Sequence, residues 1–301
     1  MEVSRLWLVS ATFAILLAIT ILIRMFMSFP QMKWPSGPKK LPIIGNLHQL
    51  GDEHLHHVAL TKLAKVHGGV MAIWIGSWRP IIVISDIDKA WEVLVTKSSD
   101  YGARDFPEIT KILTASCHTI LSSDPGAFWQ TLRKGLQSGT LGPLNIAAQS
   151  QFHKIDMKQL IQTMTDEAAK SNNIVKPMEH IKQNIEKLYQ EIRKTLNDVD
   201  LVRIEDVSKL KYLQAVVKET MRMKPIAPFA IPHKTAKETT LMGTKVAKGT
   251  SIMVNLYALH HNPDIWTEPY KFIPERFMQG EDGSATNKTM EKSFLPFGAG
   301  M

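Results

Sequence analysis

The sequence contains a single cysteine, Cys117, among its 301 residues. One thiol excludes a disulfide framework and a cysteine-rich zinc site, because both need several cysteines. The chain also lacks the glycine-rich nucleotide loops, the G-x-S-x-G turn of serine hydrolases and the H-E-x-x-H motif of zinc proteases. It has no internal repeat and no low-complexity tract. These absences remove the commonest catalytic signatures from consideration.

Basic charge is concentrated near the N-terminus. The formal net charge is +8, and half of it lies in the first 50 residues, where five Lys or Arg stand against one Glu. Elsewhere the basic residues do not cluster with aromatic ones, so the charge pattern disfavours a nucleic-acid-binding surface. The N-terminal charges flank residues 6–23, a run of 18 residues without a charge.

This uncharged run predicts a membrane anchor. At about 1.5 Å per residue, 18 helical residues span about 27 Å, close to the hydrocarbon thickness of a bilayer. A cleaved signal peptide is the alternative, but its apolar core is shorter, about 7–15 residues, and no small-residue cleavage site follows here. Because the basic residues follow the run, we expect residues 1–24 to anchor the chain in the endoplasmic reticulum membrane as a single pass, with the remainder in the cytoplasm.

Residues 25–42 are expected to form a proline-rich linker, since proline lacks a backbone donor and restricts its predecessor. From residue 43 onward, apolar periodicity predicts helices over residues 54–67, 128–136, 155–169, 181–196 and 209–223. Asp86 and Ser208 are expected helix caps. Runs rich in β-formers predict a hairpin over residues 70–76 and 80–86, and strands over residues 239–242 and 251–256. This pattern indicates a mainly α, α+β fold with small peripheral sheets.

Four short motifs follow one another along the chain: W-x-x-x-R at 129–133, E-x-x-R at 219–222, P-E-R-F at 274–277 and F-L-P-F-G-A-G-M at 294–301. Each alone has a plainer explanation. An acid and an arginine at i and i+3 are often a surface ion pair, and Glu2 with Arg5 shares that spacing by chance. Similarly, the histidines at 54–57 could bind a metal but lack a fourth ligand nearby, so a solvated helix face is expected.

Together and in this order, the motifs resemble the cytochrome P-450 superfamily of haem-thiolate monooxygenases, and the resemblance covers nearly the whole chain. It implies that Glu219, Arg222 and Arg276 form a structural triad. An arginine fork binds a carboxylate through two hydrogen bonds, and such a triad would lock the loop carrying P-E-R-F onto the E-x-x-R helix. By the same resemblance, Trp129 and Arg133 would donate to the haem propionates.

The resemblance also assigns residues to the haem cofactor elsewhere in the chain. His233 occupies a further propionate position, Arg104 is another candidate for that role, and Phe297 and Gly300 match the first fixed positions of the haem loop. The cysteine that ligates the haem iron in this family would stand four positions after Gly300, beyond Met301, so we name no catalytic or metal-binding residue. Cys117 is expected to be a small buried hydrophobic residue instead.

A second departure from the family is internal. Arg133 and Glu219 are only 86 positions apart, and the A-G-x-[DE]-T-[TS] segment of the oxygen-site helix is absent. We therefore expect an internal deletion near residues 183–185 within a partial haem-monooxygenase domain, residues 43–301. For the chain as given, we therefore expect no stable thiolate-ligated haem and no turnover.

Residues 60–70 and 231–240 resemble the plant enzymes that form methylenedioxy bridges on benzylisoquinoline alkaloids, such as canadine, stylopine and cheilanthifoline synthases. The resemblance implies an aromatic small-molecule substrate, electrons from an NADPH-dependent reductase, and contact with membrane lipid. Two hypotheses follow: a monooxygenase, or a catalytically inactive, membrane-bound fragment of one. A membrane-tethered binding module is a third class, for which the sequence offers no positive sign.

Overall fold

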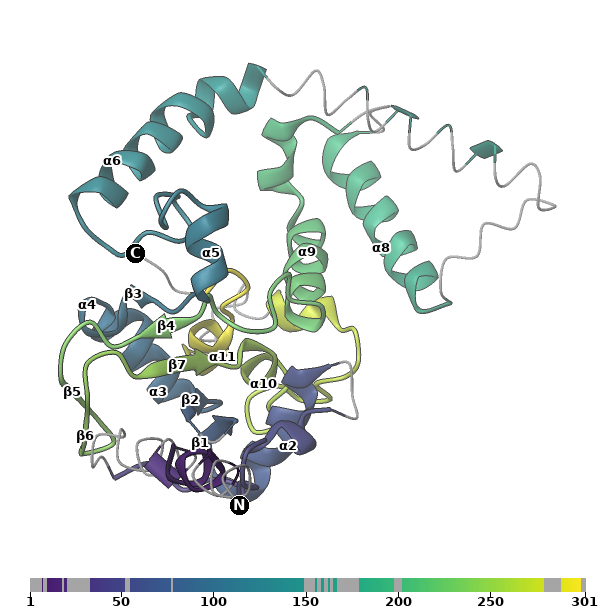
Figure 1. Cartoon of the computed structure of the whole chain (residues 1–301). Helices are drawn as coiled ribbons and strands as arrows, with labels where there is room; N and C mark the ends of the chain where they lie inside the picture. The colour runs from purple at the N-terminus through teal and green to yellow at the C-terminus, as the bar shows by residue number, and fades with distance from the viewer. Residues whose placement is uncertain are drawn as a thin grey trace. The chain divides into compact units, whose positions relative to one another are not determined.

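The computed structural model describes residues 7, 10–17, 19–20, 33–51, 55–76, 78–148, 155, 158–159, 162, 165–166, 179–197, 202–278 and 288–298. These residues belong to two compact units (Figure 1). The sheet unit comprises Met1–Asp105, Ile226–His260 and Leu295–Met301, and the helical unit comprises Phe106–Pro225 and His261–Phe294. Within the described residues, no helix has both the length and the apolar character needed to cross a membrane. The expected anchor run, residues 6–23, lies partly outside them.

The sheet unit contains a five-stranded sheet with the strand order β1-β2-β7-β4-β3. Its strands are β1 (Val70–Ile75), β2 (Arg79–Ile84), β3 (Ala103–Arg104), β4 (His233–Lys234) and β7 (Ser251–Val254). Neighbouring strands are antiparallel except β2 and β7, which are parallel. A separate antiparallel pair is formed by β5 (Thr239–Leu241) and β6 (Thr244–Val246). The predicted hairpin is therefore confirmed, and in the structure it belongs to a small mixed sheet.

Short helices accompany these strands: η1 (Leu47–Gln49), α2 (His56–His67), α3 (Ile87–Trp91), η2 (Glu92–Thr96), α4 (Ser98–Tyr101) and α10 (Leu256–His260). The predicted cap of α3 is confirmed, because the Asp86 carboxylate accepts a 2.9 Å hydrogen bond from the Lys89 N–H. Such a cap satisfies one of the donors that a helix start leaves unpaired.

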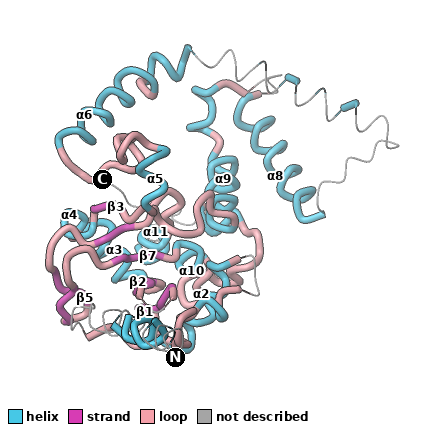
Figure 2. Tube along the Cα trace, in the orientation of Figure 1, coloured by secondary structure: helices cyan, strands magenta, loops and turns pink. Residues whose placement is uncertain are grey.

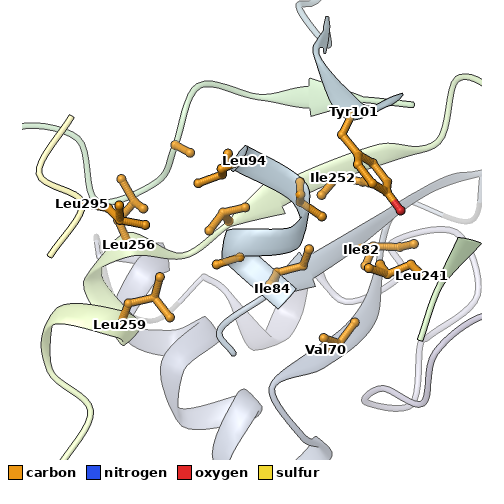
Figure 3. Close-up of a cluster of buried hydrophobic side chains, with 14 of the residues drawn as sticks. Val70, Ile82, Ile84, Leu94, Tyr101, Leu241, Ile252, Leu256, Leu259 and Leu295 are labelled. Carbon is orange, nitrogen blue, oxygen red and sulfur yellow. The ribbon is translucent and has the colours of Figure 1, made fainter. Parts of the chain in front are cut away.

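The core of the sheet unit forms on both faces of β2. Successive side chains of a strand point to opposite faces, so Ile82 and Ile84 join one buried cluster while Ile81 and Val83 join another. The first cluster also contains Ile252 of β7 and residues of α10 (Figure 3). Burial on both faces explains why β2 reads as a continuous apolar run and not as an alternating one.

Residues 33–42, the second half of the expected linker, pack on the sheet unit. The Ser36 carbonyl accepts a hydrogen bond from the Ala72 N–H of β1 at 3.3 Å. Asn46, which is fully buried, donates from its side-chain amide to the carbonyls of Pro38 and Lys39 and accepts from the Trp74 N–H. A Cβ on Gly37 would collide with the Ala72 carbonyl, so glycine is required there.

The helical unit contains α5 (Glu108–Leu113), α6 (Ala127–Gly135), η3 (Leu136–Thr140), α8 (Glu179–Leu196), η4 (Ile204–Lys209), α9 (Lys211–Met223), η5 (Pro274–Phe277) and α11 (Lys288–Ser293). Across the described residues, helix exceeds strand (Figure 2), which confirms the predicted mainly α class. The helix predicted over residues 155–169 lies largely outside the described residues.

The predicted cap of α9 is wrong. The Ser208 hydroxyl lies in η4 and donates to the Glu205 carbonyl. The first N–H groups of α9 are bound instead by the Glu191 carboxylate of α8, which accepts from Tyr212 at 2.6 Å and from Leu213 at 3.0 Å. A tertiary contact therefore supplies what the local sequence was expected to supply.

Candidate functional site

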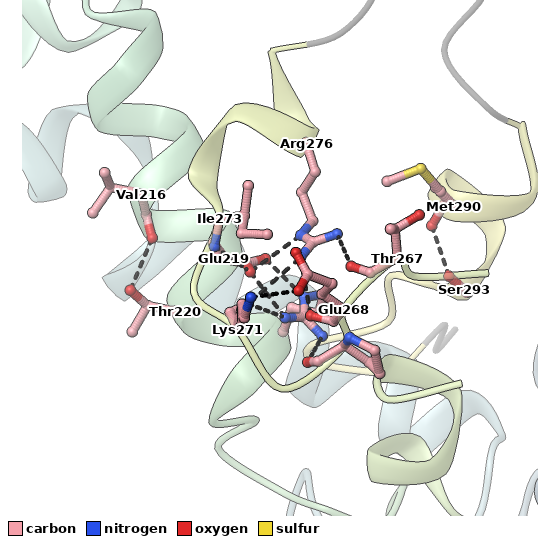
Figure 4. Close-up of polar contacts among 12 residues, drawn as sticks. Val216, Glu219, Thr220, Thr267, Glu268, Lys271, Ile273, Arg276, Met290 and Ser293 are labelled. Carbon is pink, nitrogen blue, oxygen red and sulfur yellow. Dashed lines mark hydrogen bonds and ion pairs between the residues drawn. The ribbon is translucent and has the colours of Figure 1, made fainter. Parts of the chain in front are cut away.

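The three charged residues of the predicted triad come together in the helical unit. Figure 4 shows Glu219 and Arg276 at their centre. Glu219 and Arg222 lie one turn apart on α9, and both side chains are completely buried. Arg222 donates from Nε to one Glu219 oxygen at 2.7 Å and from Nη2 to the other at 2.8 Å. Arg276 of η5 adds a bond from its Nε to the same carboxylate at 3.2 Å. The carboxylate thus joins α9 to η5.

The surrounding loop satisfies the donors that remain. Arg222 Nη1 donates to the Pro269 carbonyl at 2.8 Å, and Arg276 Nη1 donates to the Thr267 carbonyl at 2.9 Å. The Ile273 N–H donates to Glu219 at 2.9 Å. A buried ionic group is tolerated only where its hydrogen bonds are met in this way. Residues 267–277 are therefore tied to α9 by a network of polar bonds.

Trp266 covers this ionic cluster. Its side chain is fully buried, and the guanidinium carbons of Arg222 and Arg276 lie 5.2 and 6.0 Å from its ring centroid. Cations at such distances are attracted to the negative face of an aromatic ring. The indole therefore shields the two arginines from water while stabilising their charge.

A second group of predicted residues lies in the sheet unit, where the pairing of β3 with β4 places Arg104 opposite His233. The His233 Nδ1 lies 2.9 Å from the Tyr101 carbonyl, so it carries the proton and leaves Nε2 as an acceptor in the neutral ring. Burial, assisted by the positive charge of Arg104, lowers the pKa of His233 to about 4. An anion placed beside this pair would raise the pKa of His233 again.

Trp129 and Arg133 lie on one face of α6, with the guanidinium carbon 5.1 Å from the indole centroid. The Trp129 side chain is buried, and its N–H donates to the Ile120 carbonyl at 2.9 Å. The indole donor is therefore occupied by the backbone in this structure. Arg133 is half-buried, so its guanidinium is the more accessible donor of the two.

The remaining predicted residues lie at the end of the chain. Phe297 is 70% exposed and lies within a turn that is closed by a 3.0 Å hydrogen bond from the Gly298 N–H to the Leu295 carbonyl. Gly298 has a φ of +72°, which favours glycine. Gly300 lies outside the described residues.

Cys117 was expected to be buried but is only half-buried, with a φ of +65°.

Sequence reasoning missed His260. This residue ends α10, has no exposed surface, and accepts the Leu295 N–H at its Nε2 at 3.1 Å. The two partners are 35 positions apart. No local pattern predicts such a bond, although a histidine after an apolar run and before proline-rich loops is a position that could be inspected.

Comparison with known proteins gives a consistent result. The family model described as Cytochrome P450 matches residues 35–185 and 178–301. The (S)-canadine synthase of Coptis japonica is 52% identical, and its alignment runs over 433 positions, covering 100% of this chain and 88% of the relative. The cheilanthifoline synthase of Eschscholzia californica is 43% identical over 98% of this chain and 87% of the relative.

A solved structure agrees on the fold. A zebra fish cytochrome P450 with abiraterone superimposes with a TM-score of 0.61, covering 81% of this chain and 85% of that chain. At 21% sequence identity this likeness concerns the fold alone. The matches to the family model and to relatives along the chain decide the membership: this chain belongs to the cytochrome P450 family.

Proposed function

We propose that this chain is a haem monooxygenase of plant specialised metabolism that closes a methylenedioxy bridge on a benzylisoquinoline alkaloid. The observation that carries the proposal is the 52% identity with (S)-canadine synthase along the whole chain. Membership of the family implies the monooxygenase class, a haem cofactor, a small-molecule substrate and a reductase as redox partner. When bound, the haem supplies the oxidising chemistry, which the family tunes through a thiolate ligand.

The residues of the sheet unit fit a haem carboxylate. Arg104 carries a permanent charge beside His233, whose pKa of about 4 leaves it neutral at neutral pH. A propionate next to the Nε2 of His233 would favour the protonated ring, which then has a donor at each nitrogen. We therefore propose that Arg104 and His233 hold a propionate, and that binding at His233 is coupled to uptake of a proton.

We propose related roles for three further groups of residues. Arg133 donates to a propionate, and Trp129 orients Arg133 through their stacked contact on α6. Phe297 and Gly300 belong to the haem loop, in which the glycine permits a close approach of the backbone. The triad of Glu219, Arg222 and Arg276 holds residues 267–277 in place and touches no substrate.

Turnover with a matched pair of substrates tests the proposed reaction. Supplied with haem, a reductase, NADPH and dioxygen, the protein should convert an alkaloid bearing an ortho-methoxyphenol into a product two hydrogens lighter. The methyl carbon is oxidised, the neighbouring phenol oxygen bonds to it, and both oxygen atoms of dioxygen leave as water. The same alkaloid with its phenol methylated has no oxygen free to close the ring. Bridge formation from the first and not the second is expected; no ring closure by haem-loaded protein would refute the assignment.

A second candidate is a catalytically inactive fragment, and a specific observation favours it. The alignment with (S)-canadine synthase runs over 433 positions, although the chain has 301 residues. The family model matches in two segments, which meet at residues 178–185. Both observations support the proposal that a segment of the family's domain is missing near residues 183–185.

Spectroscopy separates the two candidates. The chain of 301 residues is expressed, supplied with haem, reduced and exposed to carbon monoxide. A thiolate-type Soret band would identify a haem-competent enzyme, and its absence in folded protein would identify the inactive fragment. Sequencing the mRNA across codons 178–190 then shows whether the domain segment near residues 183–185 is missing from the transcript.

We also propose that residues 1–24 anchor the chain in the endoplasmic reticulum membrane, with the remainder in the cytoplasm. The uncharged run at residues 6–23 and the basic residues after it support this orientation. The sequon at 287–289 provides the test, because a cytoplasmic site is not glycosylated. Microsomes should yield an unglycosylated, protease-accessible protein, and glycosylation at Asn287 would reverse the orientation.

A further inference from the structure

His260 is a buried histidine whose ring accepts a hydrogen bond from the backbone of a distant residue. It is the last residue of α10, its side chain has no exposed surface, and its Nε2 lies 3.1 Å from the Leu295 nitrogen. Because a backbone N–H only donates, the Nε2 must be the acceptor, so the ring is neutral and its proton is on Nδ1. A protonated imidazole has no acceptor and could not make this bond.

Leu295 is a suitable point from which to fix the haem loop. It is the second residue of the terminal motif, and its side chain is buried in the same cluster as Leu256 and Leu259 of α10 (Figure 3). Its carbonyl accepts the Gly298 N–H that closes the following turn. The side chain, the N–H and the carbonyl of one residue therefore tie the loop to α10 and to its own turn.

We propose that His260 is a positioning residue for the haem loop, acting through the hydrogen bond that its Nε2 accepts from the Leu295 N–H. A buried N–H without an acceptor is destabilising, so this amide needs a partner, and α10 provides one. Apolar packing of the side chain determines only how far Leu295 is buried. The hydrogen bond is directional, so it also determines the orientation of the peptide plane at Leu295. The inference rests on family membership and not on the proposed substrate, so it stands if the methylenedioxy assignment fails.

Hydrogen exchange of the Leu295 amide tests the proposal without any turnover. His260→Phe keeps a planar apolar ring but removes the acceptor, and exchange of this amide should become about tenfold faster, the size expected for one buried hydrogen bond. His260→Gln places an amide oxygen near the former Nε2 and should restore most of the protection. The full chain is used, and peptides from β1 and β2 report whether the sheet unit as a whole has been loosened.

His261 provides the matched control, because it is the adjacent histidine and is also buried. Its ring packs against Tyr270, so His261→Gln should leave exchange at Leu295 unchanged. Unchanged exchange in His260→Phe would overturn the proposal. Equal acceleration in His260→Phe and His260→Gln would do so too, since it would mean that the site requires the imidazole shape and not an acceptor.

Discussion

Each of the two units is stabilised internally by a different kind of interaction. The sheet unit buries two clusters of apolar side chains around β2 and β7. The helical unit places a carboxylate and two guanidinium groups at the contact of α9 and η5, all almost fully buried. Apolar packing is non-directional and tolerates substitutions of similar volume. A buried ionic cluster is stable only when it is complete, so its residues carry the recognisable motifs.

The largest effect should come from breaking that cluster. Glu219→Ala leaves Arg222 and Arg276 as buried cations without their carboxylate, and loss of one partner of a buried pair typically costs about 3–5 kcal/mol. We expect the free energy of unfolding of the helical unit to fall by this amount, measured from urea unfolding and hydrogen exchange of α9. A loss of less than about 1 kcal/mol would show that the buried ionic cluster does not stabilise this unit more than an exposed ion pair would.

Glu275 is the control for this substitution. It lies in the same motif, next to Arg276, but it is 44% exposed and pairs with the half-exposed Lys187. Exposed ion pairs contribute about 0–1 kcal/mol. Glu275→Ala should therefore change the same unfolding curve far less than Glu219→Ala.

The next effect in size is a pH dependence confined to the sheet unit. The pKa of His233 is lowered from 6.5 to about 4 by burial and by Arg104. Between these pH values the unfolded chain binds a proton that the folded unit does not, so the free energy of unfolding falls as the pH falls. The slope is at most about 1.4 kcal/mol per pH unit.

His233→Asn checks this slope, since its amide keeps a donor for the Tyr101 carbonyl but does not titrate. Urea midpoints of the sheet unit between pH 7 and 4 should fall less steeply in the variant than in the parent chain. Parallel curves would mean that His233 is not the titrating group.

A smaller effect is expected at the start of α9. Glu191→Ala removes the carboxylate that binds the Tyr212 and Leu213 N–H groups, and lost caps typically cost about 0.5–2 kcal/mol. Ser208→Ala, at the position where the sequence predicts the cap, should change little. Hydrogen exchange of residues 212–216 measures both variants, and the reverse order would restore the sequence-based assignment.

The smallest effect should follow trimming of the apolar core. Ile252, 1% exposed on β7, loses one methyl group in Ile252→Val, which typically costs about 0.5–1.5 kcal/mol. The loss should not depend on salt concentration, because no charge is involved. A salt-dependent loss, measured by urea unfolding at two ionic strengths, would show that the sheet unit is not held as described.

Local sequence patterns predicted those structural features that are formed between residues close together in the chain. The β1–β2 hairpin and the Asp86 cap follow from alternation and from a side chain that reaches three residues ahead. The capping of α9 and the His260 bond could not be read from the sequence, since the partners lie 21 and 35 positions away. Strands of two residues, such as β3 and β4, are too short to show any period.

The candidate site was foreseen mainly through family motifs. The i,i+3 spacing put Glu219 and Arg222 on one helix face, and the P-E-R-F motif added Arg276; in the structure these three side chains form ion pairs. The motifs could not foresee that the Trp129 indole would bind the Ile120 carbonyl. That bond depends on a loop whose path no motif encodes.

The docking of residues 33–46 on β1 has a further consequence. β1 is the outermost strand of its sheet, and an edge strand with unpaired backbone groups is a template for aggregation with another chain. Here the Ala72 N–H bonds to Ser36, and Trp74 bonds through both its N–H and its carbonyl to Asn46. The covering segment is itself rich in proline, which offers no N–H to a further strand. The proline-rich segment thus ends the sheet and protects it from strand addition.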